Sequence, residues 1–412
     1  MTRPTTTIDI SSPDAYANET LIADNLRRVR NETPVAWVEQ EPYAPFWAIL
    51  KHADIMEIER LGKVFINEPR LTLLPEAFER KTIETFGSRT GLVRTLLDMD
   101  EPDHRKFRQI TQVWFNGPAL EKLRMRMAAL AREYVDKLED LGGACDFAED
   151  IAVHYPLVMI TSILGLPDED VGLVLRLTQS LFGAQDPERV EKGDYGVEAA
   201  QEFFAYLSGI VAERRRAPRD DLMSVIANAQ IDGEPIRDID ALSYGMLLAA
   251  AGHDTTSASL SVGMLALARR PDQQALLKSE PDAARTASDE FFRWATPVRH
   301  FVRTAVADHE IRGVKIAKGE AVTLMYLSGN RDEEAFEEAD AFRVLRAPNR
   351  HLGFGFGPHH CLGRVLAEME LEAFLREFAA RFEWIEPAGE AEWVRTNHTG
   401  GLKRFPVRYA FR

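Results

Sequence analysis

The sequence has only two cysteines in 412 residues, Cys145 and Cys361. They stand far apart, which argues against a framework of disulfides and fits a reducing cytosol. Two cysteines are also too few for an iron–sulfur cluster, which takes four clustered cysteine ligands. No flavin-binding motif is present either. If this protein carries out redox chemistry, its electrons must therefore come from a separate protein.

Long apolar runs are also missing. The most apolar long stretch, residues 242–268, is interrupted by His253, Asp254 and several hydroxyl side chains, so it would make a poor membrane span. Residues 1–19 are polar and lack the apolar core of a signal peptide. We therefore expect a cytoplasmic protein without a membrane anchor. The net charge of −15 makes nucleic acid an unfavourable partner, because like charges repel.

No Gly/Ser-rich or Pro-rich linker divides the chain, so we expect residues 1–412 to form a single domain. Apolar residues recur at helical spacing and predict helices over 120–141, 148–165, 168–182, 192–216, 238–269 and 283–295. Short strand-like runs occur at 34–38, 46–50, 301–306, 310–316 and 321–325, followed by a β-like tail from residue 383. Asp232-Gly233 predicts a hairpin turn. The fold class is therefore expected to be mainly α with a smaller β portion.

The most informative stretch is Phe354-Gly-Phe-Gly-Pro-His-His-Cys361-Leu-Gly363. It places Cys361 at the end of a glycine-rich loop, directly before an apolar helical pattern. A thiolate there would lie at a helix N-terminus, where the dipole and free N–H groups stabilise negative charge and lower the thiol pKa. The glycines let the backbone pass close to something flat and bulky, and Phe354 and Phe356 can shield the sulfur from water. These features suit a cysteine that ligates haem iron.

Two other interpretations of Cys361 are weaker. A lone cysteine is most often buried and inert. A zinc site could use His359, His360 and Cys361, but zinc needs four ligands, usually in spaced pairs, and Cys145 has no Cys-x-x-Cys partner. The fixed Phe, Gly, Gly, His, Cys and Gly positions would recur by chance at a frequency on the order of 10^-8 per start position. The haem interpretation is therefore favoured.

A second signature, Ala251-Gly-His-Asp-Thr-Thr256, lies in the middle of the longest predicted helix. Ala251 and Gly252 have little side-chain bulk, so a flat cofactor can lie against the helix. A mid-helix threonine can donate a hydrogen bond to the carbonyl one turn back. Activation of O2 consumes protons while other water is excluded, and an acid beside a hydroxyl supplies such a relay. The alternative is a set of unremarkable polar residues, but Asp254 and Thr255 in an apolar helix are costly without a role.

These two signatures resemble those of the cytochrome P-450 family, the haem-thiolate monooxygenases, and the order of predicted elements resembles the P-450 fold nearly end to end. The resemblance implies haem b as cofactor, with Phe354 beside it and Cys361 as the iron ligand. It implies that Asp254 and Thr255 are the acid–alcohol pair of the oxygen-binding groove. The implied partners of the haem propionates are His104, Arg108, Arg303 and His359. Each of these residues alone would more often be a solvated surface charge.

The resemblance also implies a buried ion network that fixes the cysteine loop. Its members would be Glu290 and Arg293, in Glu290-Phe-Phe-Arg293, together with Arg346. The Glu-x-x-Arg spacing recurs at several places in the chain, so only its position ahead of the β segment selects this pair. Such a network should fail badly when one member is removed.

The same resemblance also implies which residues line the substrate pocket. In the family, the substrate lies against the distal helix and the turn after the Glu-x-x-Arg helix. The pocket walls implied for this chain are Leu247, Ala250, Ala251, Val298 and Phe301. For each single position, ordinary packing in the core is an equally good explanation. Their apolar character predicts a lipophilic substrate. Segments near 66–95 and 180–195 are expected to form a lid. The stretches 294–298 and 396–401 resemble the soluble bacterial terpineol-hydroxylating branch, and residues 293–334 also resemble bacterial sterol-oxidising relatives, so a terpenoid is expected and a steroid is the other candidate.

The function implied is insertion of one oxygen atom from O2 into that substrate, with electrons from NAD(P)H through a reductase and a [2Fe-2S] ferredoxin. Five cationic residues near the cysteine side of the haem could form a docking patch for the ferredoxin: Arg105, Lys106, Lys122, Arg124 and Arg364. The alternative for each is a solvated position on the face of a helix. Two other functions are a peroxide-dependent peroxygenase and a haem sensor or carrier without turnover. Asp254 and Thr255 argue against both, because a proton relay serves the reduction of O2.

Overall fold

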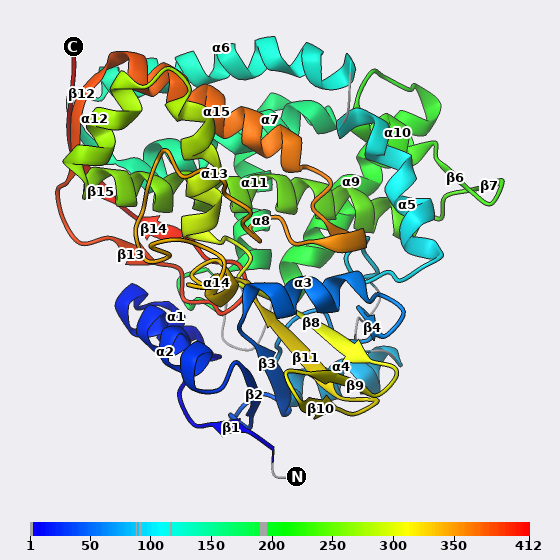
Figure 1. The fold of residues 1–412 in the computed structure, drawn as a ribbon. Helices are drawn as coiled ribbons and strands as arrows, with labels where there is room; N and C mark the ends of the chain where they lie inside the picture. The colour runs from blue at the N-terminus through cyan, green and yellow to red at the C-terminus, as the bar shows by residue number, and fades with distance from the viewer. Residues whose placement is uncertain (1–2, 88, 90–92, 116–117, 184, 190–195) are drawn as a thin grey trace.

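The computed structural model describes residues 3–87, 89, 93–115, 118–183, 185–189 and 196–412. Helices form a large upper body in Figure 1, and a smaller sheet lies below it, beside the N-terminus. The C-terminus lies at the opposite, upper end of the molecule. The expected fold class, mainly α with a smaller β portion, is confirmed.

The lower sheet takes its strands from both halves of the sequence. Strand β11 lies at its centre, parallel to β3 and antiparallel to β8. The order across the sheet is β1 (Thr5–Thr6), β2 (Val35–Val38), β3 (Phe46–Ile49), β11 (Ala321–Met325), β8 (His300–Ala305) and β4 (Phe65–Ile66). This pairing brings residues near 50 and near 300 together beside the cysteine loop.

Both faces of this sheet are covered, which explains why β2, β3 and β11 are buried at every residue. Successive side chains of β2 point to opposite faces. Ala36 and Val38 share an apolar cluster with α2 (Glu19–Glu32), whereas Val35 and Trp37 share another with α3 (His52–Arg60). Helix α3 thereby lies between the sheet and the cysteine loop, which it contacts at η4 (Gly357–His359).

The helical body is built around α11 (Asp238–Ala268), a helix of 31 residues with buried side chains on all sides. It packs against α7 (His154–Leu164), α9 (Val197–Arg216), α13 (Ala283–Ala295) and α8 (Val171–Phe182). Helix α15 (Arg364–Arg381) follows the cysteine loop and packs against α13 and α6 (Pro118–Asp140). The remaining helices are α1 (Pro13–Tyr16), α4 (Glu76–Phe86), α5 (Asp103–Gln112), α10 (Leu222–Ala227), α12 (Pro271–Ser279) and α14 (Tyr326–Gly329).

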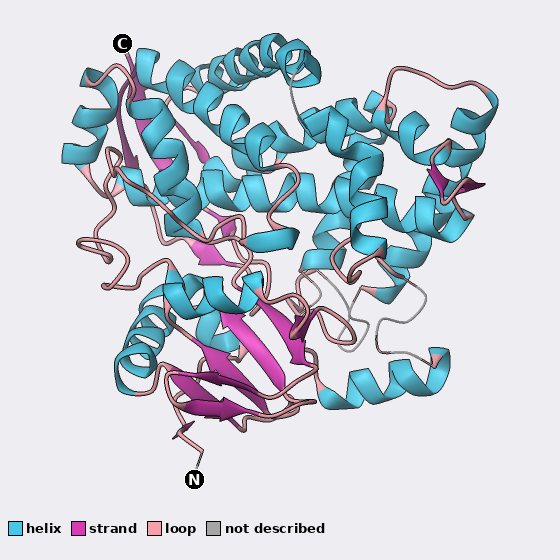
Figure 2. Ribbon diagram, turned by 45° about the vertical axis from the view of Figure 1, so that its right-hand side comes forward, coloured by secondary structure: helices cyan, strands magenta, loops and turns pink. Residues whose placement is uncertain are grey.

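A second group of strands lies along one side of the helical body, near the C-terminus (Figure 2). The chain's tail forms β12 (Phe382–Pro387) and β15 (Pro406–Phe411), and β15 lies between β12 and β5 (Ala144–Asp146) and pairs with both. Between them β13 (Glu392–Trp393) and β14 (Leu402–Arg404) form a hairpin. Its tip reaches back to the turn after α13, where Thr399 pairs with Val298. Two segments near the site, about 100 residues apart in sequence, thus meet.

The predicted helices over 120–141, 238–269 and 283–295 are confirmed, and so is the hairpin turn at Asp232-Gly233, between β6 (Gln230–Ile231) and β7 (Glu234–Pro235). The run 310–316 is not one strand. It is a hairpin of β9 (His309–Ile311) and β10 (Val314–Ile316), because Arg312 and Gly313 both have positive φ and reverse the chain. The helix over 148–165 begins as π-helix η2 (Ala148–Ala152), and the helix over 168–182 begins with 3-10 helix η3 (Asp168–Asp170). Within the described ranges, no helix is both long and apolar enough to cross a membrane.

Candidate active site

A cavity of about 1460 Å³ lies between α11 and the loop that ends at Cys361. Leu247, Ala251 and Thr255 line it from α11, and Val298 and Phe301 line it from the segment after α13. Ala250 was expected among the walls, but it is buried and does not line the cavity. The reason is helical spacing: at about 100° per residue, positions 247, 251 and 255 lie within about 80° of one another around the helix, and position 250 lies about 60° outside that arc.

The cysteine loop is shaped by its glycines: Gly353, Gly355 and Gly363 line the cavity, as expected, whereas Gly357 has a different role. Gly355 and Gly357 have φ of 66° and 70°, a region that favours glycine. A Cβ atom on Gly357 would lie 2.4 Å from the backbone carbonyl oxygen of Glu59. Gly357 is therefore required by the close approach of α3, a protein segment, rather than by a cofactor.

The loop also fixes the cysteine itself. The Cys361 amide donates a hydrogen bond of 2.9 Å to the Phe354 carbonyl, which folds the loop back on itself. Phe354 lines the cavity, as expected. Phe356 does not: the Arg60 guanidinium lies over its ring, 4.7 Å from the centroid, and its side chain joins the apolar cluster of the lower sheet. Only one of the two predicted phenylalanines therefore shields the sulfur from the cavity side.

Cys361 is open to the cavity although protein surrounds it. Helix α15 begins at Arg364, and the Gly363 amide hydrogen-bonds to the sulfur. Burial nevertheless raises the pKa of the thiol, so the protein's own groups do not produce the lowered pKa that was expected. The thiolate needs a further source of stabilisation, and a bound metal ion deprotonates a coordinating thiol outright.

On α11, Thr255 faces the cavity and donates a hydrogen bond of 2.8 Å to the carbonyl of Ala251, one turn back, as predicted. Gly252 lines the cavity beside Ala251, as expected, and it has a second role. A Cβ atom at this position would lie 2.8 Å from the side chain of Ile160, so a larger residue here would clash with helix α7.

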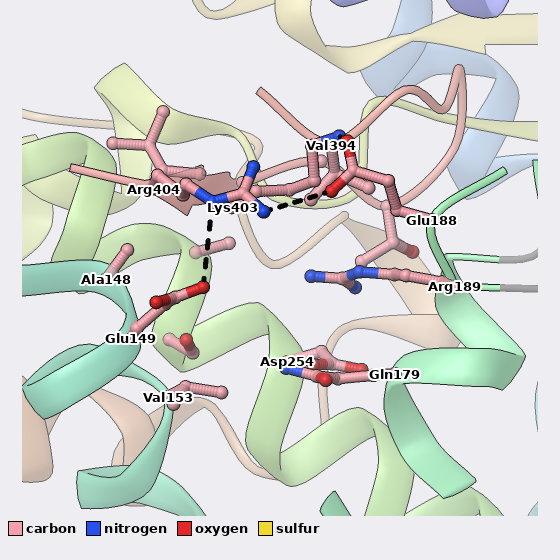
Figure 3. A pocket seen from close by; sticks show the side chains of 16 residues that line it. Ala148, Glu149, Val153, Gln179, Glu188, Arg189, Asp254, Val394, Lys403 and Arg404 are labelled. Atoms are coloured by element: carbon pink, nitrogen blue, oxygen red, sulfur yellow. Dashed lines mark hydrogen bonds and ion pairs between the residues drawn. The ribbon is translucent and has the colours of Figure 1, made fainter. Parts of the chain in front are cut away.

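Asp254 and Thr255 do not face the same space. Asp254 lines a second cavity of about 870 Å³ (Figure 3), whose side chains include Gln179, Arg189, Lys403 and Arg404. Oδ1 of Asp254 lies 3.2 Å from His253 Nδ1, while Oδ2 has no hydrogen-bond partner in the described part of the chain. The two cavities adjoin at Thr399, which lines both. The two members of the predicted acid–alcohol pair therefore point to different sides of α11: Asp254 toward the second, polar cavity and Thr255 toward the first cavity.

All four predicted propionate partners line the first cavity: His104, Arg108, Arg303 and His359. The rings of His104 and His359 stack with centroids 3.9 Å apart. Burial, followed by neighbouring cations, lowers the pKa of both imidazoles, that of His359 to about 2. They are neutral and can donate hydrogen bonds, so positive charge in this set comes from Arg108 and Arg303.

These residues fit haem b. Both ring nitrogens of His104 are buried without a hydrogen-bond partner in the described residues, and two arginines match the two propionates. The thiol of Cys361 and the hydroxyl of Thr255 line the same cavity from the cysteine loop and from α11, as a ligand and an oxygen-side group require. The described ranges contain no group of three or more His, Cys, Asp and Glu residues placed to hold a bare metal ion.

The predicted ion network is assembled as expected. Arg293 donates two hydrogen bonds of 2.7 Å to the two oxygens of Glu290, and both side chains are fully buried. Arg346 donates a third, of 3.1 Å, to Glu290. Arg293 also donates to the carbonyls of Asn330 and Ala339, and thereby ties α13 to the irregular segment before the cysteine loop.

Three residues of the site were missed by sequence reasoning. Glu59, on α3, and Tyr326, on α14, line the cavity and are hydrogen-bonded to each other at 2.7 Å. The Asn67 amide lies 2.6 Å from His359 Nε2. Glu59 and Tyr326 are 267 residues apart in sequence, and no local pattern joins them.

The five cations expected to form a docking patch are each paired with a carboxylate within 4.0 Å. The partners of Arg105, Lys106, Lys122, Arg124 and Arg364 are Glu101, Asp232, Asp220, Glu121 and Glu368. Their charges are therefore largely balanced on the protein. Of the expected lid segments, Leu71 lines the first cavity, Arg189 lines the second, and residues 88, 90–92, 184 and 190–195 lie outside the described residues.

Comparison with known proteins gives concordant matches. The sequence pattern of the cytochrome P-450 family matches residues 192–410. Cytochrome P-450-terp of Pseudomonas sp. is 38% identical over 96% of this chain and 95% of its own length. Steroid C26-monooxygenase of Mycolicibacterium smegmatis is 32% identical over 99% of this chain and 96% of its own length. The crystal structure of CYP108D1 from Novosphingobium aromaticivorans has a TM-score of 0.91 and 37% identity, and covers 99% of this chain and 100% of its own.

Proposed function

The chain belongs to the cytochrome P-450 family of haem-thiolate monooxygenases, and from this premise we propose that it inserts one oxygen atom from O2 into a terpenoid-like small molecule. We propose NAD(P)H as the source of electrons, passed through a reductase and a [2Fe-2S] ferredoxin. The observation that carries the substrate proposal is the first cavity, where apolar side chains line the same space as the Cys361 thiol.

Bound haem supplies the binding and activation of O2, with the Cys361 thiolate as the ligand of its iron. The chain's own residues hold it in place. Arg108 and Arg303 neutralise the propionates, while His104 and His359 donate hydrogen bonds to them as neutral imidazoles. Arg108 also donates a bond of 2.8 Å to the His360 carbonyl, so one side chain links the propionate site to the cysteine loop.

Protons reach the oxygen side across α11. Asp254 takes a proton from the polar cavity, where its Oδ2 has no partner among the described residues. Thr255 presents its hydroxyl to the first cavity and, because that hydroxyl already donates to Ala251, its oxygen is free to accept. Placing the acid on the polar side keeps bulk water away from the substrate while it still delivers protons.

The substrate is held by apolar contact. Leu71, Leu247, Val298 and Phe301 come from three separate segments and line the same cavity. Removing their surface and that of a lipophilic ligand from water favours binding by roughly 25 cal/mol per Å². The similarity to P-450-terp favours a terpenoid, and the similarity to a steroid C26-monooxygenase makes a steroid the second candidate.

We propose that the ferredoxin docks over a third cavity, of about 960 Å³, behind the cysteine loop. Phe354 lines both this cavity and the first one. Arg285, Arg350, His360 and Arg364 line it as well. In the described part of the chain, Arg285 and Arg350 have no carboxylate within 4.0 Å, unlike the five cations discussed above. Asp289, Glu368 and Glu372 line the same cavity, so the attraction for an acidic electron donor comes from the exposed side chains of Arg285 and Arg350 rather than from a net positive charge of the cavity.

The first experiment is a Soret-band titration of the purified ferric protein with a monocyclic terpenoid alcohol and, separately, with a steroid. A shift from low to high spin with the terpenoid supports the proposal, because the ligand then displaces water from the iron. A shift with the steroid alone moves the substrate assignment to steroids, and no shift with either contradicts the terpenoid proposal. Cys361→Ala should lose the thiolate-type spectrum, and Cys145→Ala, the matched control, should keep it.

The electron route is tested separately by turnover. Product formed with NADH, reductase and a [2Fe-2S] ferredoxin supports the proposal, whereas product formed only with hydrogen peroxide identifies a peroxygenase. The double charge reversal of Arg285 and Arg350 to Glu should weaken ferredoxin binding and leave the Soret titration unchanged. Arg408→Glu, a reversal of an exposed arginine on β15, is the control and should change neither.

A further inference from the structure

Glu59 is a buried carboxyl group at the wall of the first cavity, and the proposed mechanism gives it no part. It lies next to the last residue of α3, and its side chain is only 2% exposed. Its Oε1 accepts a hydrogen bond of 2.7 Å from the Tyr326 hydroxyl and lies 3.5 Å from Nη2 of Arg303. Its Oε2 is buried without a hydrogen-bond partner in the described residues. Oε1 is thus fixed by neighbouring side chains, whereas Oε2 has no hydrogen-bond partner among the described residues.

The same residue is in contact with the cysteine loop. Its backbone carbonyl is the group that requires glycine at position 357. The Phe356 amide lowers the pKa of its carboxyl group, and a Cβ atom on Gly355 would lie 3.5 Å from its Oε1. The carboxyl is therefore fixed by β8, by α14 and by the loop that carries the iron ligand.

The charges around Glu59 do not balance once haem is bound. Arg303 from β8 is the nearest cation, and it is also assigned to a propionate. Tyr326 from α14 is neutral, because burial raises its pKa well above the ordinary value, and His359 from η4 is neutral because burial lowers its pKa. Arg60, the next residue on α3, has its guanidinium over Phe356. One guanidinium cannot compensate two buried carboxylates, so one proton must be held there.

We infer that Glu59 is a proton-exchanging acid of the haem site, which takes up one proton from solvent when the haem iron gains one electron. The inference rests on the proposed contact between Arg303 and a propionate. An electron added to the iron places a further negative charge near Glu59 and disfavours its ionised form. Burial already raises the pKa of Glu59 to about 7, so the carboxyl exchanges its proton near neutral pH. Glu59 would act as a positioning and tuning residue rather than a catalytic one.

The test is the midpoint potential of the haem-loaded protein as a function of pH, measured by dithionite titration with mediators. In the wild type the potential should fall as pH rises through neutrality. A tenfold difference in proton affinity between the ferric and ferrous forms corresponds to about 59 mV. Glu59→Gln keeps the side-chain size but cannot ionise, so its potential should be flat over the same range. Glu57→Gln removes an exposed carboxylate from the same helix and should behave as the wild type.

Tyr326→Phe provides a second test in case the Glu59→Gln protein does not retain haem. The Tyr326 hydroxyl stabilises ionised Glu59, so its removal should raise the pKa of Glu59 and move the fall in potential to higher pH. A Glu59→Gln protein with the wild-type pH dependence, or a Tyr326→Phe protein with an unmoved transition, overturns the inference. A terpenoid-binding wild type with a flat potential refutes the role of Glu59 alone. A pH-dependent potential without any terpenoid response refutes the substrate proposal alone.

Discussion

Glu290 and Glu59 are both buried carboxyl groups beside an arginine, but their surroundings differ. Both oxygens of Glu290 accept hydrogen bonds from Arg293, and Arg346, the Arg343 amide and the Asn349 amide add three more. Glu59 receives one bond from Tyr326, lies 3.5 Å from Arg303, and has an oxygen without a partner among the described residues. A buried polar group is normally satisfied, so an open one that also lines a cavity indicates a place where a ligand supplies the missing partner.

Other buried polar groups also differ in whether all their atoms have hydrogen-bond partners. His104 and Asp254 are like Glu59, because each has a buried atom without a partner in the described residues and each lines a cavity. His300 is like Glu290: its Nε2 accepts from the Leu73 amide and its Nδ1 pairs with the Asn397 carbonyl. We expect changes to the satisfied groups to damage the fold, and changes to the open groups to alter function at nearly unchanged stability.

Glu290→Gln should have the largest effect. It leaves the charges of Arg293 and Arg346 buried without their counter-ion, which is expected to lower the free energy of unfolding by about 3–5 kcal/mol. Urea unfolding and the haem content of the purified protein measure this. Glu121→Gln is the matched control, since Glu121 and Arg124 have the same spacing on an exposed helix face and should lose less than about 1 kcal/mol. Equal stability of the two variants would contradict a structural role for Glu290.

Asp254→Asn should come next and should affect rate only. Loss of a positioned acid costs roughly 100-fold in turnover, while the melting temperature should stay at the wild-type value. The measurement is product formation with saturating ferredoxin. Ser257→Ala changes another residue of α11 that lines the same polar cavity and should keep normal turnover. An active Asp254→Asn protein would place the proton route elsewhere.

Thr255→Ala should have a smaller effect, on coupling rather than on rate. Without the hydroxyl on the cavity side, NADH should still be oxidised, but less product should form for each NADH consumed. Product and hydrogen peroxide are measured in the same reaction. Thr255→Ser restores the hydroxyl and should recover most of the coupling. Unchanged coupling in the alanine variant would argue against the relay.

The smallest expected effect is the pH dependence of stability that Glu59 contributes. Its pKa of about 7 in the folded protein lies above the ordinary value of 4.5, so folding favours the protonated form. This contribution is fully present below pH 4.5 and is lost as pH rises through about 7. The melting temperature of the wild type should therefore fall by ~2 °C relative to Glu59→Gln over that range. A constant difference between the two proteins would contradict the raised pKa.

The sequence was sufficient where chemistry lies in a short motif or in a long periodic helix. The Cys361 loop, Thr255, the Glu290 network and α11 lie where they were predicted, and the similarity to P-450-terp agrees with the predicted branch. What failed depends on neighbours distant in sequence. Gly357 is required by the backbone of Glu59, Glu59 meets Tyr326 only in the folded chain, and Asp254 opens into a polar cavity built from distant segments.

The spacing of α11 has a consequence for how this protein can change over time. Asp254 and Thr255 are adjacent in sequence, yet they open into different cavities. Each residue of an α-helix turns the chain by about 100°, so one residue inserted before Asp254 would move the Asp254 carboxyl to the position of Thr255, at the apolar cavity, and leave the polar cavity without its acid. Natural and engineered descendants can tolerate insertions at the β6–β7 hairpin, where Asp232 and Gly233 are exposed, whereas α11 can vary by substitution but not in length.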